Sequence, residues 1–143
     1  MAIVAAGFLF FGSGLISKEK RGKVFIKGQE FNVEIADNAT ARSRGLSGRE
    51  KLEANEGILF LFSKAGYQSF WMKGMKIPID IIWIKGETIV GFEKDVQPEP
   101  ETNMLRLRTY SSPEAVEKVL EVPAGTVERL DIQVGDKAVL SYN

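Results

Sequence analysis

Residues 70–84 read FWMKGMKIPIDIIWI, and the second half of this stretch decides the expected fold. A strand that begins at Ile79 is apolar on both faces except for one charged residue, Asp80. Alternation divides this strand into the face of Ile79, Ile81 and Trp83 and the face of Asp80, Ile82 and Ile84. Burial of an unpaired carboxylate is costly. We therefore expect Asp80 to lie at an open edge of the core, to pair with a basic group or to take up a proton.

The segments on either side of this strand have the alternating or continuous apolar patterns of further short strands. Glycine-containing connections predict two hairpins among them. The expected strands are residues 24–27, 30–36, 58–62, 68–73, 79–85, 87–94, 118–122 and 137–142. Short helices are expected before Gly45 and at residues 127–130. The sequence therefore predicts a mainly β fold with minor α, namely a compact antiparallel β-sandwich or barrel-like domain with one or two short helices.

The composition bounds both the size of the core and the chemistry. With 143 residues, 44% of them hydrophobic, the chain suits one domain with its own core. Lys and Arg number 19 and so do Asp and Glu, so no basic excess favours nucleic acid as a partner. The sequence has no His and no Cys, which excludes imidazole bases, thiol nucleophiles, disulfides and the usual zinc sites. Acidic residues at 93–101 do not match the spacing of a calcium loop, so we expect no metal site and no cofactor.

The N-terminal segment has the pattern of a membrane boundary. Residues 1–17 carry no charge, and a mostly basic stretch follows at residues 18–23. We therefore expect residues 1–22 to be a hydrophobic signal-like or membrane-anchor segment and residues 23–143 to be a single domain. The alternative is a buried N-terminal strand or helix of the domain. The basic flank after residue 17 is compatible with a domain on the cytoplasmic face.

Six motifs follow one another along the chain. They are RSRGLSGR (42–49), GILFLF (57–62), FWMK (70–73), IPIDII (77–82), VLEVPAG (119–125) and GD (135–136). In this order they resemble the DUF192 family, also called UPF0127, of uncharacterised bacterial and archaeal proteins, over about residues 31–140. The family usually has Asn where this chain has Gly74. The resemblance implies a compact, mainly β fold, often behind a signal or anchor sequence and so on the extracytoplasmic side, and it brings no known reaction or ligand.

The first hypothesis for Asp80 is a structural clamp. A guanidinium stays charged when it is buried and holds a carboxylate with two hydrogen bonds. We therefore expect Asp80 to pair with an arginine of the first short helix or of the turn that follows it, and Glu121 to pair with an arginine as well. The clamp set is Arg42, Arg44, Arg49, Asp80 and Glu121.

The second hypothesis is a ligand site on the same segment. Phe70, Trp71 and Trp83 offer flat rings that stack on a sugar or another planar ligand, although large aromatic residues more often pack in a core. Charged side chains at the rim would then bind its polar groups. The predicted ligand-binding residues are Trp71, Lys73, Asp80 and Arg49.

A third hypothesis is acid–base catalysis by two carboxylates, Asp80 and Glu121. Glycoside hydrolysis requires such a pair about 5–10 Å apart across one cleft. Our leading interpretation is nevertheless a non-catalytic, membrane-tethered or exported binding domain with a small aromatic and charged pocket. Its expected partners are a membrane, through residues 1–22, and a small-molecule, glycan or peptide ligand. The alternative is a carboxylate-dependent hydrolase that acts on a glycan or envelope polymer.

Overall fold

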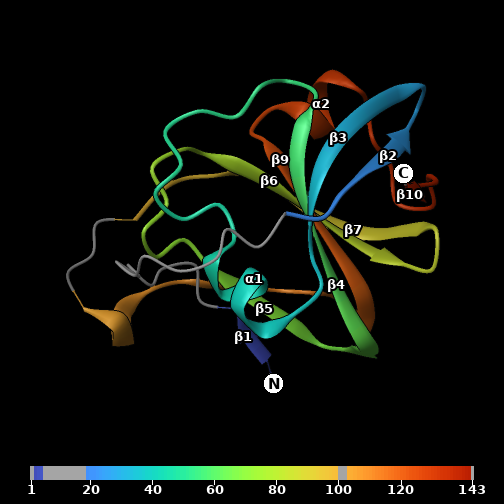
Figure 1. The fold of residues 1–143 in the computed structure, drawn as a ribbon. Helices are drawn as coiled ribbons and strands as arrows, with labels where there is room; N and C mark the ends of the chain where they lie inside the picture. Colours follow the sequence, from blue (N-terminus) through green and yellow to red (C-terminus); the bar gives the residue numbers. More distant parts are fainter. Residues whose placement is uncertain (1, 5–18, 100–102, 143) are drawn as a thin grey trace.

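The computed structural model describes residues 2–4, 19–99 and 103–142, which form a mainly β fold (Figure 1). The strands are β1 (Ala2–Val4), β2 (Arg21–Ile26), β3 (Gln29–Ala36), β4 (Glu56–Gly66), β5 (Gln68–Trp71), β6 (Ile79–Lys85), β7 (Thr88–Val96), β8 (Thr109–Ser111), β9 (Val116–Pro123) and β10 (Val139–Tyr142). The helices are α1 (Ala39–Arg44), the 3-10 turn η1 (Met104–Arg106) and α2 (Thr126–Arg129). The predicted β-rich fold with short helices is confirmed.

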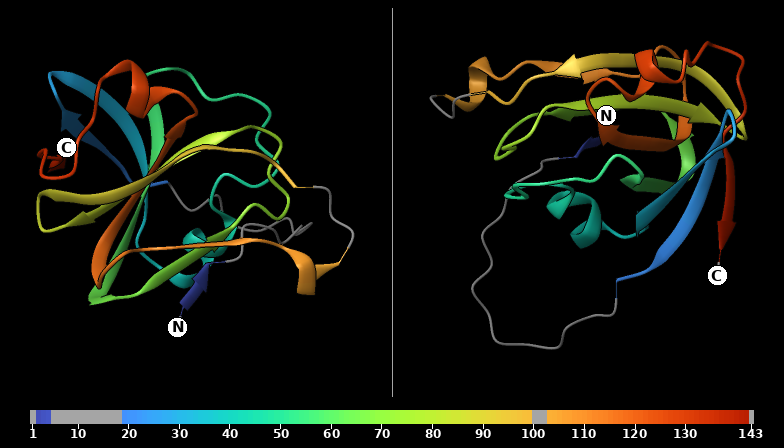
Figure 2. Two further views of the ribbon diagram at one scale, coloured as in Figure 1. Left: turned by 180° about the vertical axis from the view of Figure 1, so that it is seen from behind. Right: turned by 90° about the horizontal axis from the view of Figure 1, so that it is seen from above.

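Two sheets make up the domain. The larger has the strand order β10-β2-β3-β4-β9-β6-β7, and the smaller has the order β1-β5-β8. Most neighbours are antiparallel, but β3 pairs with β4 in parallel, and so does β1 with β5. A parallel pair needs a crossover connection, and residues 37–55, which contain α1, supply it between β3 and β4. The large sheet is therefore mixed, and it does not close into a barrel within the described residues; the arrangement is sandwich-like (Figure 2).

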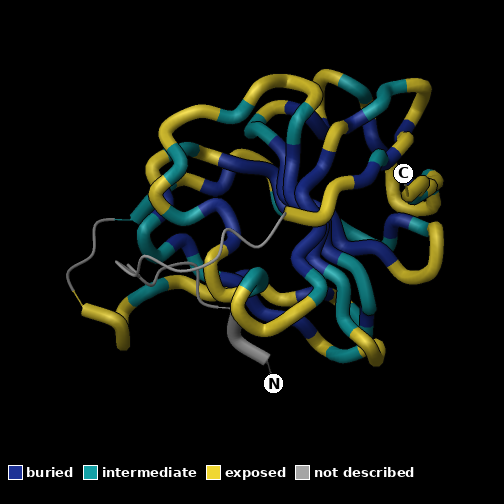
Figure 3. Tube along the Cα trace, in the orientation of Figure 1, coloured by how far each residue is buried: buried dark blue, intermediate teal, exposed yellow. Residues whose placement is uncertain are grey.

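The large sheet carries a core on each face, as alternation along β6 predicts. One cluster includes Ile79, Ile81 and Trp83, and the opposite cluster includes Ile82 and Ile84. The first cluster also contains residues of β5, β8 and the turn after β5, namely Phe70, Met72, Met75 and Tyr110. The second also contains Val127 of α2 and Ile132 beyond it. Figure 3 accordingly shows the buried chain concentrated where the strands cross.

Local signals place the hairpins and α1. Lys27 and Gly28 have φ of 48° and 77°, the left-handed conformation that a tight hairpin turn requires, and they join β2 to β3. Asn38 caps α1 by accepting a hydrogen bond of 2.9 Å from the backbone N–H of Ala41, and Gly45 ends the helix with φ of 48°. The hairpin β6–β7, strand β9 and strand β10 were also expected. Strand β8 was not expected, and β1 corresponds to the alternative of a buried N-terminal strand.

The N-terminal segment contributes to both sheets. Ala2–Val4 pairs with β5, and β2 begins at Arg21, two residues before the expected start of the domain. The expected anchor or signal character of residues 5–18 lies outside the described residues. Within the described part of the chain, no helix is long and apolar enough to cross a membrane.

Candidate functional site

Asp80 is closed off from solvent and bonded to backbone groups. Its side chain is fully buried, and one oxygen, Oδ1, accepts hydrogen bonds from the N–H groups of Asp95 (2.8 Å) and Gly125 (3.3 Å). The other oxygen, Oδ2, accepts one from the N–H of Val127 at 2.8 Å. Three donors compensate for the loss of water around the carboxylate. The predicted pairing of Asp80 with an arginine is therefore wrong, and Asp80 instead joins β6 to the end of β7 and to α2.

The three arginines of the expected clamp have separate partners. Arg42 donates to the carbonyl of Leu61 at 2.9 Å and lies over the ring of Phe62, 5.1 Å from its centroid. Arg44 pairs with Glu19 at 3.8 Å on the surface. Arg49 pairs with Glu34, a residue that the sequence analysis did not single out. The arginine-rich motif thus fixes the crossover to the sheet without reaching β6.

Asp80 and Glu121 lie on opposite faces of the large sheet. In the pairing of β6 with β9, Asp80 is opposite Val122 and Ile81 is opposite Glu121. Paired residues share a face and neighbouring residues do not. Asp80 therefore shares the face of Ile82, whereas Glu121 shares the face of Ile81. The carboxylate pair proposed for catalysis is contradicted, because the sheet itself separates the two groups.

Glu121 instead shares its face with Glu34. The register pairs Glu34 with Ile58 of β4, and Ile58 with Glu121 of β9. The three residues form one row across the sheet, and two strand spacings put the Cα atoms of the two glutamates about 10 Å apart. The sequence shows that Glu34 lies within an alternating strand, but only the pairing of three distant strands brings it next to Glu121.

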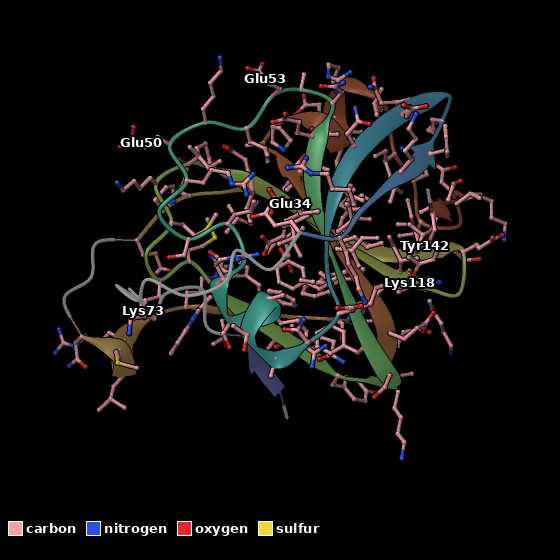
Figure 4. The ribbon with its side chains drawn as sticks, viewed as in Figure 1. Glu34, Glu50, Glu53, Lys73, Lys118 and Tyr142 are labelled. Atoms are coloured by element: carbon pink, nitrogen blue, oxygen red, sulfur yellow. The ribbon has the colours of Figure 1, made fainter. Side chains whose placement is uncertain are left out.

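One oxygen of Glu34 is unpaired in the interior. Glu34 is 7% exposed, and its Oε1 accepts a hydrogen bond from Nη2 of Arg49. Its Oε2 is buried and meets no donor among the described residues. Figure 4 shows Glu34 near the crossing of the strands, inside the loop that carries Glu50 and Glu53. A buried acceptor of this kind costs free energy until a donor reaches it.

Glu121 is a buried acid. Its side chain is 6% exposed, and burial raises its pKa from 4.5 to about 8. Desolvation disfavours the charged form of a carboxyl group. At neutral pH Glu121 is therefore mainly protonated and has both an O–H donor and a carbonyl acceptor. Glu121, a neutral acid, and the partly unpaired carboxyl group of Glu34 thus flank Ile58 on one sheet face.

A pocket of about 190 Å³ reaches this row from the side of α1. Glu34 and Ile58 belong to its wall, and the remaining lining residues are Glu19, Lys20, Ile35, Ala36, Asp37, Asn38, Ala41 and Arg44. The cations Lys20 and Arg44 form ion pairs with Asp37 and Glu19 respectively. The pocket is smaller than a drug-sized site, and its volume corresponds to a few water molecules or one small polar group.

Trp71 and Lys73 lie on a different part of the domain. The Lys73 Nζ atom is 5.8 Å from the centroid of the Trp71 ring and 3.6 Å from Sδ of Met104. Trp71 Nε1 is buried and meets no acceptor among the described residues. The four predicted ligand-binding residues are therefore not one site: Arg49 is held by Glu34, Asp80 by backbone groups, and only Trp71 and Lys73 contact each other.

A second, larger pocket of about 340 Å³ lies at the end of β7. Its wall includes Glu93, Asp95, Glu99, Arg108 and Tyr110. The guanidinium carbon of Arg108 is 4.8 Å from the centroid of the Tyr110 ring. Within the described ranges, no group of three or more Asp or Glu side chains is arranged to hold a metal ion.

Comparison with known proteins identifies a family but no activity. A crystal structure from Sinorhizobium meliloti 1021, named as a candidate transcription regulator, has a TM-score of 0.75 and 29% identity, over 89% of this chain and 98% of that one. A protein of unknown function from Novosphingobium aromaticivorans DSM 12444 has a TM-score of 0.77 and 26% identity, over 90% of this chain and 91% of that one. No curated protein matches the chain. The family model of DUF192, described as "Uncharacterized ACR", matches residues 22–140, and the chain belongs to this family.

Proposed function

We propose that this protein is a non-catalytic binding domain that takes a small ligand with a protonated amine at Glu34, beside the row that ends in Glu121. The observation that carries the proposal is the buried Oε2 of Glu34, which has no donor among the described residues and belongs to a residue of the pocket wall. An unmade hydrogen bond of this kind costs about 1–3 kcal/mol, and a ligand donor recovers it.

The charges around the pocket favour a cation. Lys20 and Arg44 are already paired with acidic side chains, and Arg49 bonds to the other oxygen of Glu34. The unpaired oxygen therefore keeps part of the negative charge of its carboxylate. A protonated amine forms a charge-assisted hydrogen bond with it, which is stronger than a bond from a hydroxyl. Neutral Glu121, one strand beyond Ile58 and outside the pocket wall, adds no repulsion.

The test is a titration of the full chain with small amines. Methylamine, ethanolamine and putrescine are the probes, glucose is the neutral control, and binding is measured by calorimetry and by NMR shifts of the Glu34 amide. We expect Glu34→Gln to weaken amine binding at least about ten-fold, because a hydrogen bond to a charged group is lost. Glu50→Gln is the matched control, since the Glu50 side chain is 82% exposed and pairs with Lys76 on the surface. Equal binding by wild type and Glu34→Gln contradicts the proposal.

A second candidate function is a carboxylate-dependent hydrolase, and the raised pKa of Glu121 favours it. In this version Glu121 donates a proton to a leaving-group oxygen, and Glu34 in place of Asp80 accepts one from the attacking water. Glycan hydrolysis that Glu121→Gln abolishes supports this candidate. Amine binding without any turnover of glycans supports the binding domain instead.

The membrane-tethered or exported location of the domain is part of the proposal. It is supported by the uncharged residues 1–17, whereas the basic stretch that follows them favours the cytoplasmic face for a tethered domain. Protease access to the domain in intact and in permeabilised cells tests which side of the membrane it occupies. Digestion only after permeabilisation of the cytoplasmic membrane contradicts an extracytoplasmic location.

A further inference from the structure

Strand β5 has two partners of very different kinds. On one side it pairs with β8 of the domain body, and on the other side with β1, the three residues Ala2–Val4 (Figure 1). Without β1, this second side of β5 is an edge with unpaired backbone groups. The occupant of this edge comes from the segment whose sequence predicts a signal or anchor.

The backbone groups that face β1 are identified by alternation. The N–H of Ser112 donates to the carbonyl of Gln68 at 2.9 Å, so the backbone of Gln68 points toward β8. Backbone groups of successive residues in a strand point to opposite sides. The N–H and C=O groups of Ser69 and Trp71 therefore point toward β1.

The same reasoning applies to β1. Its register is parallel and pairs Ile3 with Ser69. In a parallel pair, a residue of one strand bonds to the residues on either side of its partner. Ala2 and Val4 therefore direct their backbone groups to β5, and Ile3 directs its own away from it. Three residues in a parallel pair make few hydrogen bonds, so the backbone bonds of β1 contribute little to holding it against β5.

Trp71 adds an unpaired side-chain donor at this edge. Its backbone faces β1, and its Nε1 is buried without an acceptor among the described residues. Indole is a donor only, and when buried it usually finds an acceptor. A longer extended chain along β5 brings further carbonyl groups past Trp71.

We propose that the β1 side of β5 is a binding edge for an extended apolar peptide segment of another protein, which adds in parallel, and that residues 2–4 are its competitor within the chain. Strand addition gives affinity through backbone bonds and specificity through side chains. The apolar character follows from the present occupant, which reads AIV. This edge is distinct from the Glu34 pocket, and the inference does not depend on the proposed function.

The proposal also connects the two interpretations of the N-terminal segment. Residues 2–4 cannot pair with β5 and lie in a membrane at the same time. A chain whose first residues are inserted in a bilayer therefore presents the edge of β5 for a partner, and a chain in which they are paired has it covered.

The test uses labelled peptides with the sequence of residues 2–7 and two added lysines, and follows their anisotropy on addition of the full chain. One peptide is unmodified, one is N-methylated at the position of Val4, and one at the position of Ile3. We expect the unmodified peptide and the peptide methylated at Ile3 to bind and to shift the NMR signals of the Ser69 and Trp71 amides. We expect the peptide methylated at Val4 not to bind, because its methyl group replaces the amide hydrogen that points toward β5. Equal binding by both methylated peptides overturns the proposal.

Proline variants of the full chain test the competition. Val4→Pro removes an N–H that faces β5, whereas Ile3→Pro removes one that faces away, a position where an edge strand tolerates proline. If β1 is paired nine-tenths of the time, Val4→Pro raises the apparent peptide affinity about ten-fold, and Ile3→Pro changes it little. Equal affinities of the two variants overturn the competition. If the protein is a dimer in solution and Val4→Pro dissociates it, the edge of β5 is occupied by a second copy of this chain. That result overturns the inference of a different partner.

Discussion

Asp80 and Glu121 belong to adjacent strands, yet one carboxylate accepts three backbone hydrogen bonds on one face of the sheet and the other lies protonated on the opposite face. The two acids have no common site. Asp80 is a structural joint, and Glu121 belongs to the row that reaches the pocket. Their different surroundings lead to different expected effects of substitution.

Replacement of Asp80 should destabilise the fold without any ligand present. In Asp80→Asn the amide presents N–H groups to at least one of the backbone donors that the carboxylate now binds, and the bonds to a charged group are lost. We expect the free energy of unfolding to fall by about 2–4 kcal/mol, measured by urea denaturation. Asp95→Asn is the control: Asp95 has φ of 51°, a conformation that Asn tolerates, so its stability should change by less than about 0.5 kcal/mol. Similar losses of stability in both variants contradict the structural role of the Asp80 carboxylate.

Glu121 should make stability fall as the pH rises. Its pKa is about 8 in the folded chain and near 4.5 in the unfolded chain, so between these values the folded state binds more protons. The contribution of Glu121 to stability is then most favourable at low pH and declines toward pH 8, with a slope of at most about 1.4 kcal/mol per pH unit.

Glu121→Gln should remove this contribution, so that the stability difference between the variant and the wild type shifts in favour of the variant from pH 5 to pH 8. Denaturation at several pH values measures it, with Glu50→Gln as the exposed control. A difference that is independent of pH contradicts the buried, protonated state of Glu121.

Removal of Arg49 should destabilise the fold through its effect on Glu34. In Arg49→Ala the buried carboxylate loses its ion-pair partner, and we expect a loss of about 1–3 kcal/mol, less than for a fully buried pair because the Arg49 side chain is 33% exposed. Arg44→Ala breaks only a surface pair with Glu19 and should cost less than about 1 kcal/mol. Thermal unfolding of both variants gives the comparison. Equal losses of stability in the two variants contradict a larger contribution from the Glu34–Arg49 pair.

Gly57 should not tolerate a side chain. A Cβ atom there would lie 2.6 Å from the backbone oxygen of Glu121, whereas at Gly66 the nearest atom is the flexible Gln68 amide at 3.4 Å. We expect Gly57→Ala to cost about 1–3 kcal/mol through overpacking and to shift the Glu121 amide in NMR spectra. Gly66→Ala, which has room, should change stability by less than about 0.5 kcal/mol. A stable Gly57→Ala domain contradicts the close approach of β4 and β9.

The sequence predicts the two faces of β6 because alternation is a local property, and it predicts a short helix before Gly45, capped by Asp37 or Asn38, for the same reason. The partners of Asp80 are not local. From the sequence, an arginine is the expected partner of a buried carboxylate. The backbone N–H groups that bind Asp80 come together only when the turns around Asp95 and Gly125 are folded, so the sequence does not predict them. Local signals therefore describe the strands but not the bonds between them.

Glu34 illustrates the same limit at the candidate site. Its pattern is that of any polar residue in a strand, and only the parallel pairing of β3 with β4 and the antiparallel pairing of β4 with β9 places it in one row with Glu121. In the sequence, a strand near the N-terminus is only the alternative to a membrane segment. The length and apolar character of residues 1–17 do not distinguish the two, because pairing with β5 depends on backbone groups.

The parallel pairing of β3 with β4 has a consequence for how the chain folds. It forms only after the crossover of residues 37–55 closes, and β4 must then meet β9, which begins at Val116. Contacts between such distant segments slow folding, because loop-closure entropy is lost before any contact is gained. The row from Glu34 to Glu121 is complete only when β9 pairs with β4. In a nascent or truncated chain without β9, the β4 edge beside Ile58 and Glu34 is unpaired, so amine binding would report on whether β9 is in place.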